Sequence, residues 1–523
     1  MEEQHRFNEL FRSFTIDNAL IHVHQLLERA TALWPHKTML LCQDDEMTYQ
    51  EVYNRSMQFA HELRSRGVHP GERVIILYEN SIEFFIAYYA VWHAGGVVVP
   101  LNVFLIQHEI EHIILDSQPA AIIVSPLLRD KLEHLSPELL SHVITDIDIK
   151  SPAPHHVERI PFSFKNPHDM VALLYTSGTT GFPKGVMLSS LNIITNVFQG
   201  ISRFDTQSTD RILCALPLFH CFPQSMSLWL APLVGGSVII VPKIERKMLF
   251  KGASKKPTFV IAVPALYGLM CLLRIPFKSV RYFISGGDAL SDKIRTYFEL
   301  LYGRKLCNGY GLTETTPFIA VDTDDFTQST NTIGRPFVGI TCSIRDEHQN
   351  ELPKGSIGVL WVKGGNVMLG YYNAPEATAA IMHNGWLNTG DLAFLDRNGK
   401  IVLAGREKDL ISNKGLKIYP QEIENVLLSH PAIIQAGVIG VKEREEEFPV
   451  AFVAARDSSP EKLIPELKML CTQKLAPYKV PRHFYVHKEL PVTATGKINK
   501  KLLREELAPK EDSSGDFHRD RRS

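Results

Sequence analysis

The sequence lacks an excess of charge of either sign. Its 523 residues carry 56 Lys and Arg against 57 Asp and Glu, a formal net charge of −1 at pH 7. With 45% apolar and 22% charged residues, the composition is that of an ordinary globular chain. This excludes a disordered chain and a nucleic-acid binder that depends on excess positive charge, so we expect no nucleic-acid partner. A chain of this length is too long to fold around one small hydrophobic core, so we expect more than one domain.

Paired cysteines are also missing. The seven cysteines are scattered singly, without a C-x-x-C pair, and an odd number without a framework fits a reducing compartment. The first ten residues, MEEQHRFNEL, hold acidic side chains and no apolar core, so they do not read as a secretory signal. We therefore expect a cytoplasmic location.

No apolar run is long and uninterrupted enough to span a membrane. The most apolar stretch, FFIAYYAVWHAGGVVVPL from Phe84, contains His93, a Gly-Gly break and Pro100. It predicts a buried helix followed by a buried strand. Contact with a membrane is thus expected to be peripheral at most.

Helix and strand signals alternate through the first 125 residues. Thr48 and Glu51 form a capping box ahead of a helix that Gly67 can end, and a second helix follows Ser81. Short strands are predicted at 73–78, at 97–101 and from residue 120, with a further helix around 106–115. Strand–helix–strand at this spacing implies right-handed crossovers and a parallel sheet.

The pattern of predicted helices and strands changes near residue 405. Residues 126–168 are expected to be a surface excursion, and the α/β alternation then resumes at Met170 and continues to about residue 400. Beyond Gly405 we expect a helix at 420–428, two apolar strands, and a helix with Ser459 as its N-cap and Pro460 in its first turn.

The predicted fold is therefore α/β: a large N-terminal domain with twisted, mostly parallel sheets, and a small mobile C-terminal α+β domain. The predicted boundaries are 1–405 for the first domain and 406–510 for the second, followed by a disordered tail at 511–523.

One loop carries chemistry. YTSGTTGFPKG, Tyr175 to Gly185, follows the apolar strand VALLYT. Backbone N–H groups at glycine, hydroxyl side chains and Lys184 together can cradle a polyphosphate. The alternative is a hydroxyl-rich surface turn. The loop is not an ordinary P-loop, because Pro183 precedes the lysine and Gly185 follows it.

Taken whole, the loop resembles the phosphate loop of the adenylate-forming (AMP-binding) enzymes. YGLTETTP from Tyr310, WLNTGDL from Trp386, GREKDLISNKG from Gly405 and PVTATGK from Pro491 resemble the family's other motifs in order and spacing. The chain is most similar to the fatty-acyl-CoA ligases. The resemblance covers residues 25–507 and implies that ATP activates a carboxylate to an acyl-adenylate, with release of pyrophosphate, before a thiol takes the acyl group.

The resemblance implies a role for each matching residue. The residues that would hold the β- and γ-phosphates are Thr176, Ser177, Gly178, Thr179, Thr180 and Lys184. Glu314 would bind Mg²⁺ and Thr313 would touch the α-phosphate. Tyr310 would lie against adenine, with the backbone at Gly286 and Gly287 as the opposite wall.

Asp391 would accept hydrogen bonds from the ribose hydroxyls and Arg406 would support the same sugar. Lys497 is the expected catalytic residue, since a compact ammonium can stabilise charge as the carboxylate attacks the phosphate. Lys408 lies at the family's hinge, about which the C-terminal domain rotates to present its other face, near Gly415, for thiol attack. Without the motif, Lys497 would read as one more lysine of a basic tail.

The acyl group is predicted from LPLFHCFPQS, Leu216 to Ser225. In relatives that activate amino acids, an aspartate follows the aromatic residue, whereas here Phe219 is followed by His220. A lining without a carboxylate suits an acid without an amino group, and we expect a medium- to long-chain fatty acid. His220 is expected to gate this pocket; the alternative is a satisfied core histidine. Pro223 and Gln224 occupy a neighbourhood where related ligases often carry glycine.

Several alternatives remain open at this point. The acceptor thiol is that of CoA or the phosphopantetheine of an acyl carrier protein, and an aryl acid also suits an uncharged pocket. A nucleotide-binding scaffold without catalysis is disfavoured because Lys497, Glu314 and Lys184 are all present. His22 and His24, two apart in the first expected helix, should face different directions, and without a third ligand they predict no metal site. The oligomeric state is not predicted.

Overall fold

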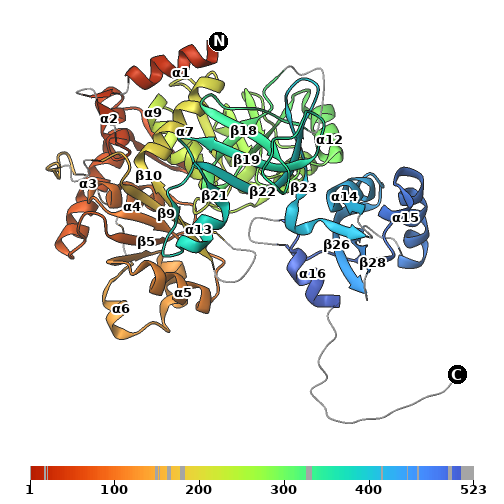
Figure 1. The fold of residues 1–523 in the computed structure, drawn as a ribbon. Coiled ribbons are helices and arrows are strands. Elements are labelled where there is room, and N and C mark those ends of the chain that lie inside the picture. The colour runs from red at the N-terminus through yellow and green to blue at the C-terminus, as the bar shows by residue number, and fades with distance from the viewer. Residues whose placement is uncertain are drawn as a thin grey trace, which may run out of the picture. The chain divides into compact units, whose positions relative to one another are not determined.

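The computed structural model describes most of the chain (Figure 1). The described residues are 2–13, 15–16, 19–20, 22–145, 147, 151, 154–161, 166–176, 183–324, 332–413, 416–443, 446–455, 459–492 and 497–507, with side chains left undescribed at 10–20. The tail predicted at 511–523 lies outside them. The chain divides into two compact units, Met1–Leu403 and Ala404–Ser523, and each is described by itself.

The first unit contains a seven-stranded sheet in the order β20-β10-β9-β6-β5-β7-β8. Its strands are β5 Arg73–Leu77, β6 Val97–Pro100, β7 Ala121–Val124, β8 Val143–Ile144, β9 Met170–Thr176, β10 Lys184–Ser189 and β20 Gly370–Tyr371. The strands from β9 to β8 pair in parallel, as the strand–helix–strand spacing predicted, and β10 pairs antiparallel with both β9 and β20.

Local signals set the helices of this region. In α3, Tyr49–Ser65, the Glu51 side chain accepts the Thr48 N–H at 2.7 Å while the Thr48 hydroxyl caps the helix, so the predicted capping box is confirmed. Ser81 caps α4, Ile82–His93, whose residues from Phe84 to His93 are all buried. Of the helices that the structure describes, none combines the length and the apolar character that crossing a bilayer requires.

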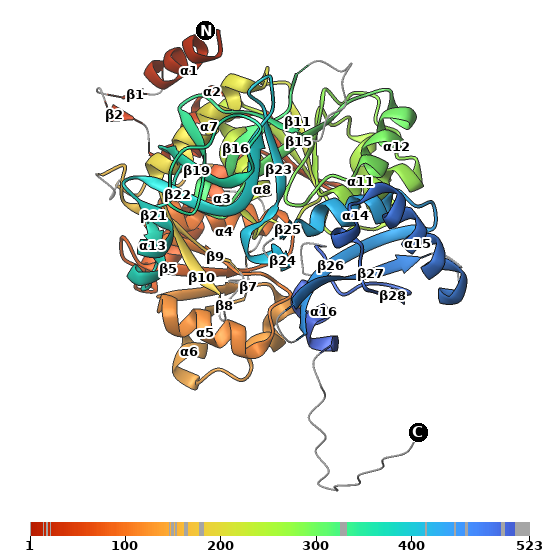
Figure 2. The same ribbon diagram turned by 45° about the vertical axis from the view of Figure 1, so that its right-hand side comes forward.

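A second sheet of fourteen strands has the order β18-β19-β22-β23-β17-β16-β15-β14-β13-β11-β12-β3-β4, with β21 beside β22. Figure 2 labels several of its strands, among them β15, β16, β19, β22 and β23. Its strands are β3 Thr38–Cys42, β4 Asp45–Thr48, β11 Arg211–Cys214, β12 Ser237–Ile240, β13 Phe259–Ala262, β14 Tyr282–Ser285, β15 Leu306–Gly311, β16 Phe318–Val321, β17 Thr332–Pro336, β18 Ile340–Arg345, β19 Gly358–Gly364, β21 Met382–His383, β22 Trp386–Leu395 and β23 Ile401–Arg406.

The predicted α/β alternation up to residue 400 is wrong beyond β15. From β15 to β17 the strands pair antiparallel, as do β18 with β19 and β19 with β22. Among the described residues of 318–406, the one α-helix is α13, Pro375–Ile381. Antiparallel neighbours need only short connections, whereas a parallel crossover needs about a dozen residues or more. Antiparallel pairing of these neighbouring strands therefore replaces the parallel crossovers that the alternation assumed.

The first unit holds further helices around these sheets. They are α1 Glu2–Ser13, α2 Gln25–Leu33, α5 Gln107–Ser117, α6 Pro137–Ser141, α7 Ser190–Arg203, α8 Cys221–Gln224, α9 Ala231–Val234, α10 Arg246–Ser254, α11 Pro264–Leu273 and α12 Asp292–Tyr302, and two short strands, β1 Thr15–Ile16 and β2 Ala19–Leu20, pair with each other.

Two further expectations need correction. The predicted surface excursion at 126–168 contains α6 and also β8, which extends the first sheet by pairing in parallel with β7. His22 and His24 precede α2 and face each other, with their Nδ1 atoms 2.9 Å apart. Both are buried. A bend in the chain before the helix starts, which helical spacing could not predict, turns both rings to the same side.

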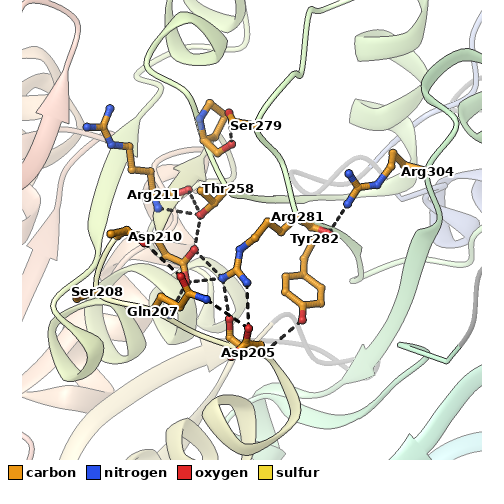
Figure 3. Close-up of polar contacts among 12 residues, drawn as sticks. Asp205, Gln207, Ser208, Asp210, Arg211, Thr258, Ser279, Arg281, Tyr282 and Arg304 are labelled. Atoms are coloured by element: carbon orange, nitrogen blue, oxygen red, sulfur yellow. Dashed lines mark hydrogen bonds and ion pairs between the residues drawn. The ribbon is translucent and has the colours of Figure 1, made fainter.

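A buried carboxylate joins the amino ends of three parallel strands (Figure 3). The Arg281 guanidinium, directly before β14, donates to both carboxylate oxygens of Asp210 at 2.8 Å. The Thr258 hydroxyl, before β13, donates to the same carboxylate at 2.7 Å and accepts the Arg211 N–H of β11. Asp210 is 3% exposed. Because these contacts occupy the amino ends of β11, β13 and β14, the opposite, carboxyl ends of the strands are left for chemistry.

The second unit is a small α+β domain. Its elements are β24 Ile411–Asn413, β25 Leu416–Ile418, α14 Pro420–Leu428, β26 Ile433–Glu443, β27 Glu446–Ala455, α15 Pro460–Lys474, β28 His483–His487 and α16 Lys500–Leu507. Alternate residues of β27 enter two cores: Ala451 and Val453 pack with α14 and α15, and Val450 and Phe452 pack with Leu503 of α16. The helices predicted at 420–428 and from Pro460 are confirmed. Both begin with a proline in the first turn, where its fixed φ and missing N–H are tolerated.

Candidate active site

The two ends of the glycine loop lie side by side. Thr176 ends β9 and Lys184 begins β10, and the two residues are direct cross-strand partners. Ser177, Gly178, Thr179 and Thr180, between them, lie outside the described residues. Gly185, the second residue of β10, is closely packed: a Cβ atom there would lie 2.8 Å from a Leu173 methyl group and 3.2 Å from the Tyr175 ring.

Glu314 follows the carboxyl end of β15, in the 3₁₀ turn Thr313–Thr315. One oxygen of its carboxylate, Oε1, accepts the hydroxyl of Tyr371 at 2.7 Å. Its backbone carbonyl accepts the Met368 N–H at 2.9 Å. The buried Asn366 amide donates to the carbonyls of Thr315 and Phe318 and so fixes the turn. Glu314 and Thr313 are both half-buried, in reach of a ligand and still held by the fold.

The two residues predicted for the nucleoside are joined. Tyr310, in β15, donates its hydroxyl to Asp391 Oδ2 of β22 at 2.5 Å. Asp391 is 6% exposed, and its N–H donates to the Thr389 hydroxyl. A buried aspartate with a fixed backbone is preorganised to accept hydrogen bonds.

The glycines predicted for the adenine wall follow β14, beside β15. Gly286 is buried, and a Cβ there would lie 3.2 Å from the ring of Phe222 and 3.5 Å from the Gly309 carbonyl. Gly287 is exposed and has φ +84°, a left-handed conformation that favours glycine. Since β14 and β15 are parallel neighbours, these glycines and Tyr310 emerge at the same edge of the sheet.

The predicted acyl segment lies beside these residues. Phe219 is 7% exposed, with its ring centroid 4.5 Å from that of His220 and 6.4 Å from that of Phe104. Phe222 packs on Phe318 at 6.3 Å. Burial raises the pKa of the Cys221 thiol, and the nearby charge of Glu314 raises it further. The ring of Phe222 also lies against the backbone of Gly286, so the apolar segment adjoins the end of β14.

Gln224 lies in the segment where related ligases often carry glycine. It is fully buried, its amide oxygen accepts the Tyr88 hydroxyl at 3.0 Å, and its amide nitrogen donates to the Leu218 carbonyl at 2.9 Å. The Trp229 indole donates to the same Tyr88 hydroxyl. This buried network fixes the segment that carries Phe219, because every polar group in it has a partner.

The remaining predicted residues belong to the second unit. Arg406 ends β23 and Lys408 lies in the 3₁₀ turn Glu407–Asp409, and both are exposed. Lys497 is half-buried and directly precedes Ile498, which forms a β-bridge with Val492. Gly415 and residues 493–496 of the predicted catalytic loop lie outside the described residues.

The charged residues of this site in the first unit suit a phosphate-containing substrate that binds as a complex with a metal cation. In the described part of the chain, no cluster of three or more His, Cys, Asp or Glu side chains is arranged to hold a metal ion. One carboxylate, that of Glu314, and one ammonium, that of Lys184, instead share Tyr371 as a neighbour. Mg²⁺ is usually bound by one or two carboxylates together with substrate phosphates, so this donor set fits it.

Sequence reasoning missed two residues of this group. Tyr371, in MLGYYNAPEAT, joins Glu314 and Lys184, and Phe222 packs against the Gly286 backbone. The sequence signal for Tyr371 is the glycine that precedes it, Gly370. In the structure this glycine has a φ of +143°, a conformation that favours glycine. Phe222 belongs to the predicted apolar segment LPLFHCFPQS, but its packing against Gly286 could not be predicted, because its partners come from distant strands.

Comparisons with known proteins agree with this geometry. The family described as "AMP-binding enzyme" matches residues 27–372, and the "AMP-binding enzyme C-terminal domain" matches residues 422–497. A long-chain-fatty-acid–CoA ligase of Bacillus subtilis (strain 168) is 31% identical over 92% of this chain and 94% of its own length.

Two solved structures share the fold. The anthranilate CoA ligase AuaEII in complex with anthranoyl-AMP is 27% identical with a TM-score of 0.86, over 93% of this chain and 97% of the other. ATP-bound MatB from Rhodopseudomonas palustris is 28% identical with a TM-score of 0.83, over 97% and 99% of the two chains. The α/β fold class predicted from the sequence is confirmed. On this combination of motifs, geometry and full-length similarity, the chain belongs to the AMP-binding enzymes, the adenylate-forming acyl-CoA ligase family.

Proposed function

We propose that this chain is an AMP-forming fatty-acid–CoA ligase, acting on a medium- to long-chain acid. A carboxylate oxygen of the fatty acid attacks the α-phosphorus of ATP, and the bond to pyrophosphate breaks. The sulfur of CoA then attacks the acyl carbon of the adenylate, the bond to AMP breaks, and acyl-CoA is formed.

The observation that carries the proposal is the contact between an apolar segment and a nucleotide site. Phe219 and Cys221 are buried, and the ring of Phe222 lies against Gly286, a residue of the expected adenine wall. The sequence FHCF of this segment contains no carboxylate that could bind an ammonium group. A hydrocarbon chain has no polar group that would need a partner there. The full-length similarity to long-chain-fatty-acid–CoA ligases supports the same acid.

The chemistry requires that two anions meet, so fixed donors and cations must spread their charge. Lys184 and Thr176, paired across the β9–β10 hairpin, hold the β- and γ-phosphates together with Ser177, Gly178, Thr179 and Thr180. Thr313 touches the α-phosphate. Glu314 would hold Mg²⁺, which supplies positive charge to the phosphate oxygens.

Other residues bind the nucleoside and stabilise the transition state. Tyr310 lies against adenine, opposite the backbone at Gly286 and Gly287. Asp391 and Arg406 bind the ribose. Lys497 stabilises the charge that develops as the carboxylate attacks, and Lys408 is the hinge at which the backbone changes between the two half-reactions.

Pyrophosphate release across straight-chain acids of rising length, with and without CoA, tests the proposal. We expect release that depends on a long-chain acid, and acyl-CoA formed when CoA is added. Release with aryl acids and not with fatty acids would make this chain an aryl-acid ligase, like the anthranilate ligase that it resembles in structure. Acid-dependent release with no thioester to CoA would favour an acyl carrier protein as acceptor. No release with any acid would contradict a catalytic role altogether.

A further inference from the structure

Tyr371 is held firmly by its backbone. It ends β20, which pairs antiparallel with β10, and its direct partner there is Val186. The Tyr371 N–H donates to the Thr378 hydroxyl at 2.8 Å. The next residue, Tyr372, donates its N–H to the Gly185 carbonyl at 2.7 Å. The backbone of Tyr371 is therefore fixed in the sheet, and its cross-strand partner Val186 lies two residues after Lys184 in β10.

This one side chain contacts both charges of the phosphate site. Its hydroxyl donates to Glu314 Oε1 at 2.7 Å, and the Lys184 ammonium lies over its ring, 5.5 Å from the centroid.

The chemistry of a tyrosine suits this position. A neutral hydroxyl orients a carboxylate without cancelling its charge, whereas Lys or Arg at the same place would compete with a metal cation. A cation over an aromatic face is held weakly, so a phosphate can draw the ammonium away. The same ring keeps Lys184 near the site while the hydroxyl holds Glu314.

We propose that Tyr371 is a positioning residue for ATP activation: its hydroxyl orients Glu314 toward Mg²⁺, and its ring keeps Lys184 available for phosphate. The inference rests on the proposed function, because it takes Glu314 as the Mg²⁺ carboxylate and Lys184 as the phosphate ligand. It adds a residue that acts through these two and does not itself touch the nucleotide.

Tyr371→Phe separates the two roles, since it removes the hydroxyl and keeps the ring. Two readouts are used: the Mg²⁺ concentration for half-maximal pyrophosphate release, and calorimetric binding of ATP with and without Mg²⁺. We expect the Mg²⁺ requirement to rise about tenfold, as for other residues that orient metal ligands. ATP binding without Mg²⁺ and the KM for the fatty acid should not change. Tyr371→Leu, which also removes the ring, should weaken ATP binding without Mg²⁺ as well.

The matched control is Tyr372→Phe, the neighbouring tyrosine, whose ring packs in the core cluster with Tyr175 and Met187. If Tyr371→Phe and Tyr372→Phe have the same Mg²⁺ requirement, the inference is overturned while the ligase function stands. If the wild-type chain releases no pyrophosphate with any acid, the proposed function fails, and calorimetry with MgATP still decides the role of Tyr371.

A double-mutant cycle guards against a general loss of stability. Once Glu314→Gln has removed the carboxylate charge, Tyr371→Phe should have no further effect on Mg²⁺-dependent ATP binding. Additive effects of the two substitutions would show that Tyr371 does not act through Glu314 and would overturn the proposal.

Discussion

The Tyr310 hydroxyl donates to the Asp391 carboxylate at 2.5 Å, across 81 residues of sequence. The two motifs that hold these residues were each weak signals alone: a tyrosine after a strand, and an aspartate in a Gly-Asp turn. Their contact joins β15 to β22 and brings the expected adenine and ribose contacts into one group. A ligand that touches both residues meets a carboxylate whose orientation is already fixed.

Asp391→Ala should raise the KM for ATP more than Tyr310→Phe does. Removing the hydroxyl forfeits one hydrogen bond, worth about 1 kcal/mol or roughly fivefold in affinity. Removing the carboxylate also takes away the proposed ribose acceptor, and we expect an effect of about tenfold or more. Steady-state kinetics with varied ATP measure both. Equal effects of the two variants would contradict a direct role for Asp391.

Lys497→Ala should abolish adenylate formation and leave ATP binding intact. Loss of one donor that stabilises developing charge typically costs about 10²–10³ in rate. Lys501→Ala is the matched control, since Lys501 is 83% exposed and only loosely paired with Glu505 at 3.9 Å. Acid-dependent pyrophosphate release measures the effect. Wild-type release from the Lys497 variant would remove this residue from the mechanism.

Lys408→Pro should spare the first half-reaction and block thioester formation. Proline fixes φ, so a hinge that must change its backbone loses that freedom. Pyrophosphate release in a single turnover reports the first step, and acyl-CoA the second. If both fall equally, Lys408 is not a hinge.

Asp210→Ala should destabilise the first unit by about 2–4 kcal/mol, because it leaves Arg281 and Thr258 without their shared, buried acceptor. Asp44→Ala is the control: this residue is 89% exposed and pairs with Lys251 at the surface, so little change in the unfolding free energy is expected. Urea unfolding of the full chain compares the two. Similar losses in both variants would contradict the role assigned to the Asp210 cluster.

Stability should fall as the pH drops below about 6.5 because of three buried histidines. Burial lowers the pKa of His22 and of His93 to about 3, and burial together with His22, His93 and Arg159 lowers that of His24 further. The unfolded chain therefore binds protons that the folded chain excludes between about pH 3 and pH 6.5. This contribution is fully present above pH 6.5 and is lost toward pH 3.

Urea unfolding midpoints at pH 7.5 and pH 5 measure this loss, and His24→Gln should reduce the difference between them. Glu28, which pairs with Arg159 at 3.0 Å, and Tyr53, whose ring lies against His93, are the other titratable groups near the cluster. Glu28→Gln serves as the control for a nearby carboxylate. A midpoint that does not change between the two pH values would contradict the prediction.

The sequence by itself determined the features that depend on residues close together in the chain, above all where helices begin. The capping box at Thr48, the N-cap at Ser81 and the first-turn prolines of α14 and α15 are local hydrogen-bonding or backbone signals, and each helix begins where they predicted. The motif at Tyr175–Gly185 identified the family for the same reason, since a phosphate-binding loop is a continuous segment.

Only the tertiary structure decided which distant residues meet. The antiparallel pairing beyond β15 and the contacts of Tyr371 with Glu314 and Lys184 join segments whose signals are separate in sequence. Strand order and side-chain direction depend on how whole elements pack to bury apolar surface, and no residue carries that information alone. The residue types of the site could therefore be read from the chain, whereas the side chain that holds two of them together could be found only in the fold.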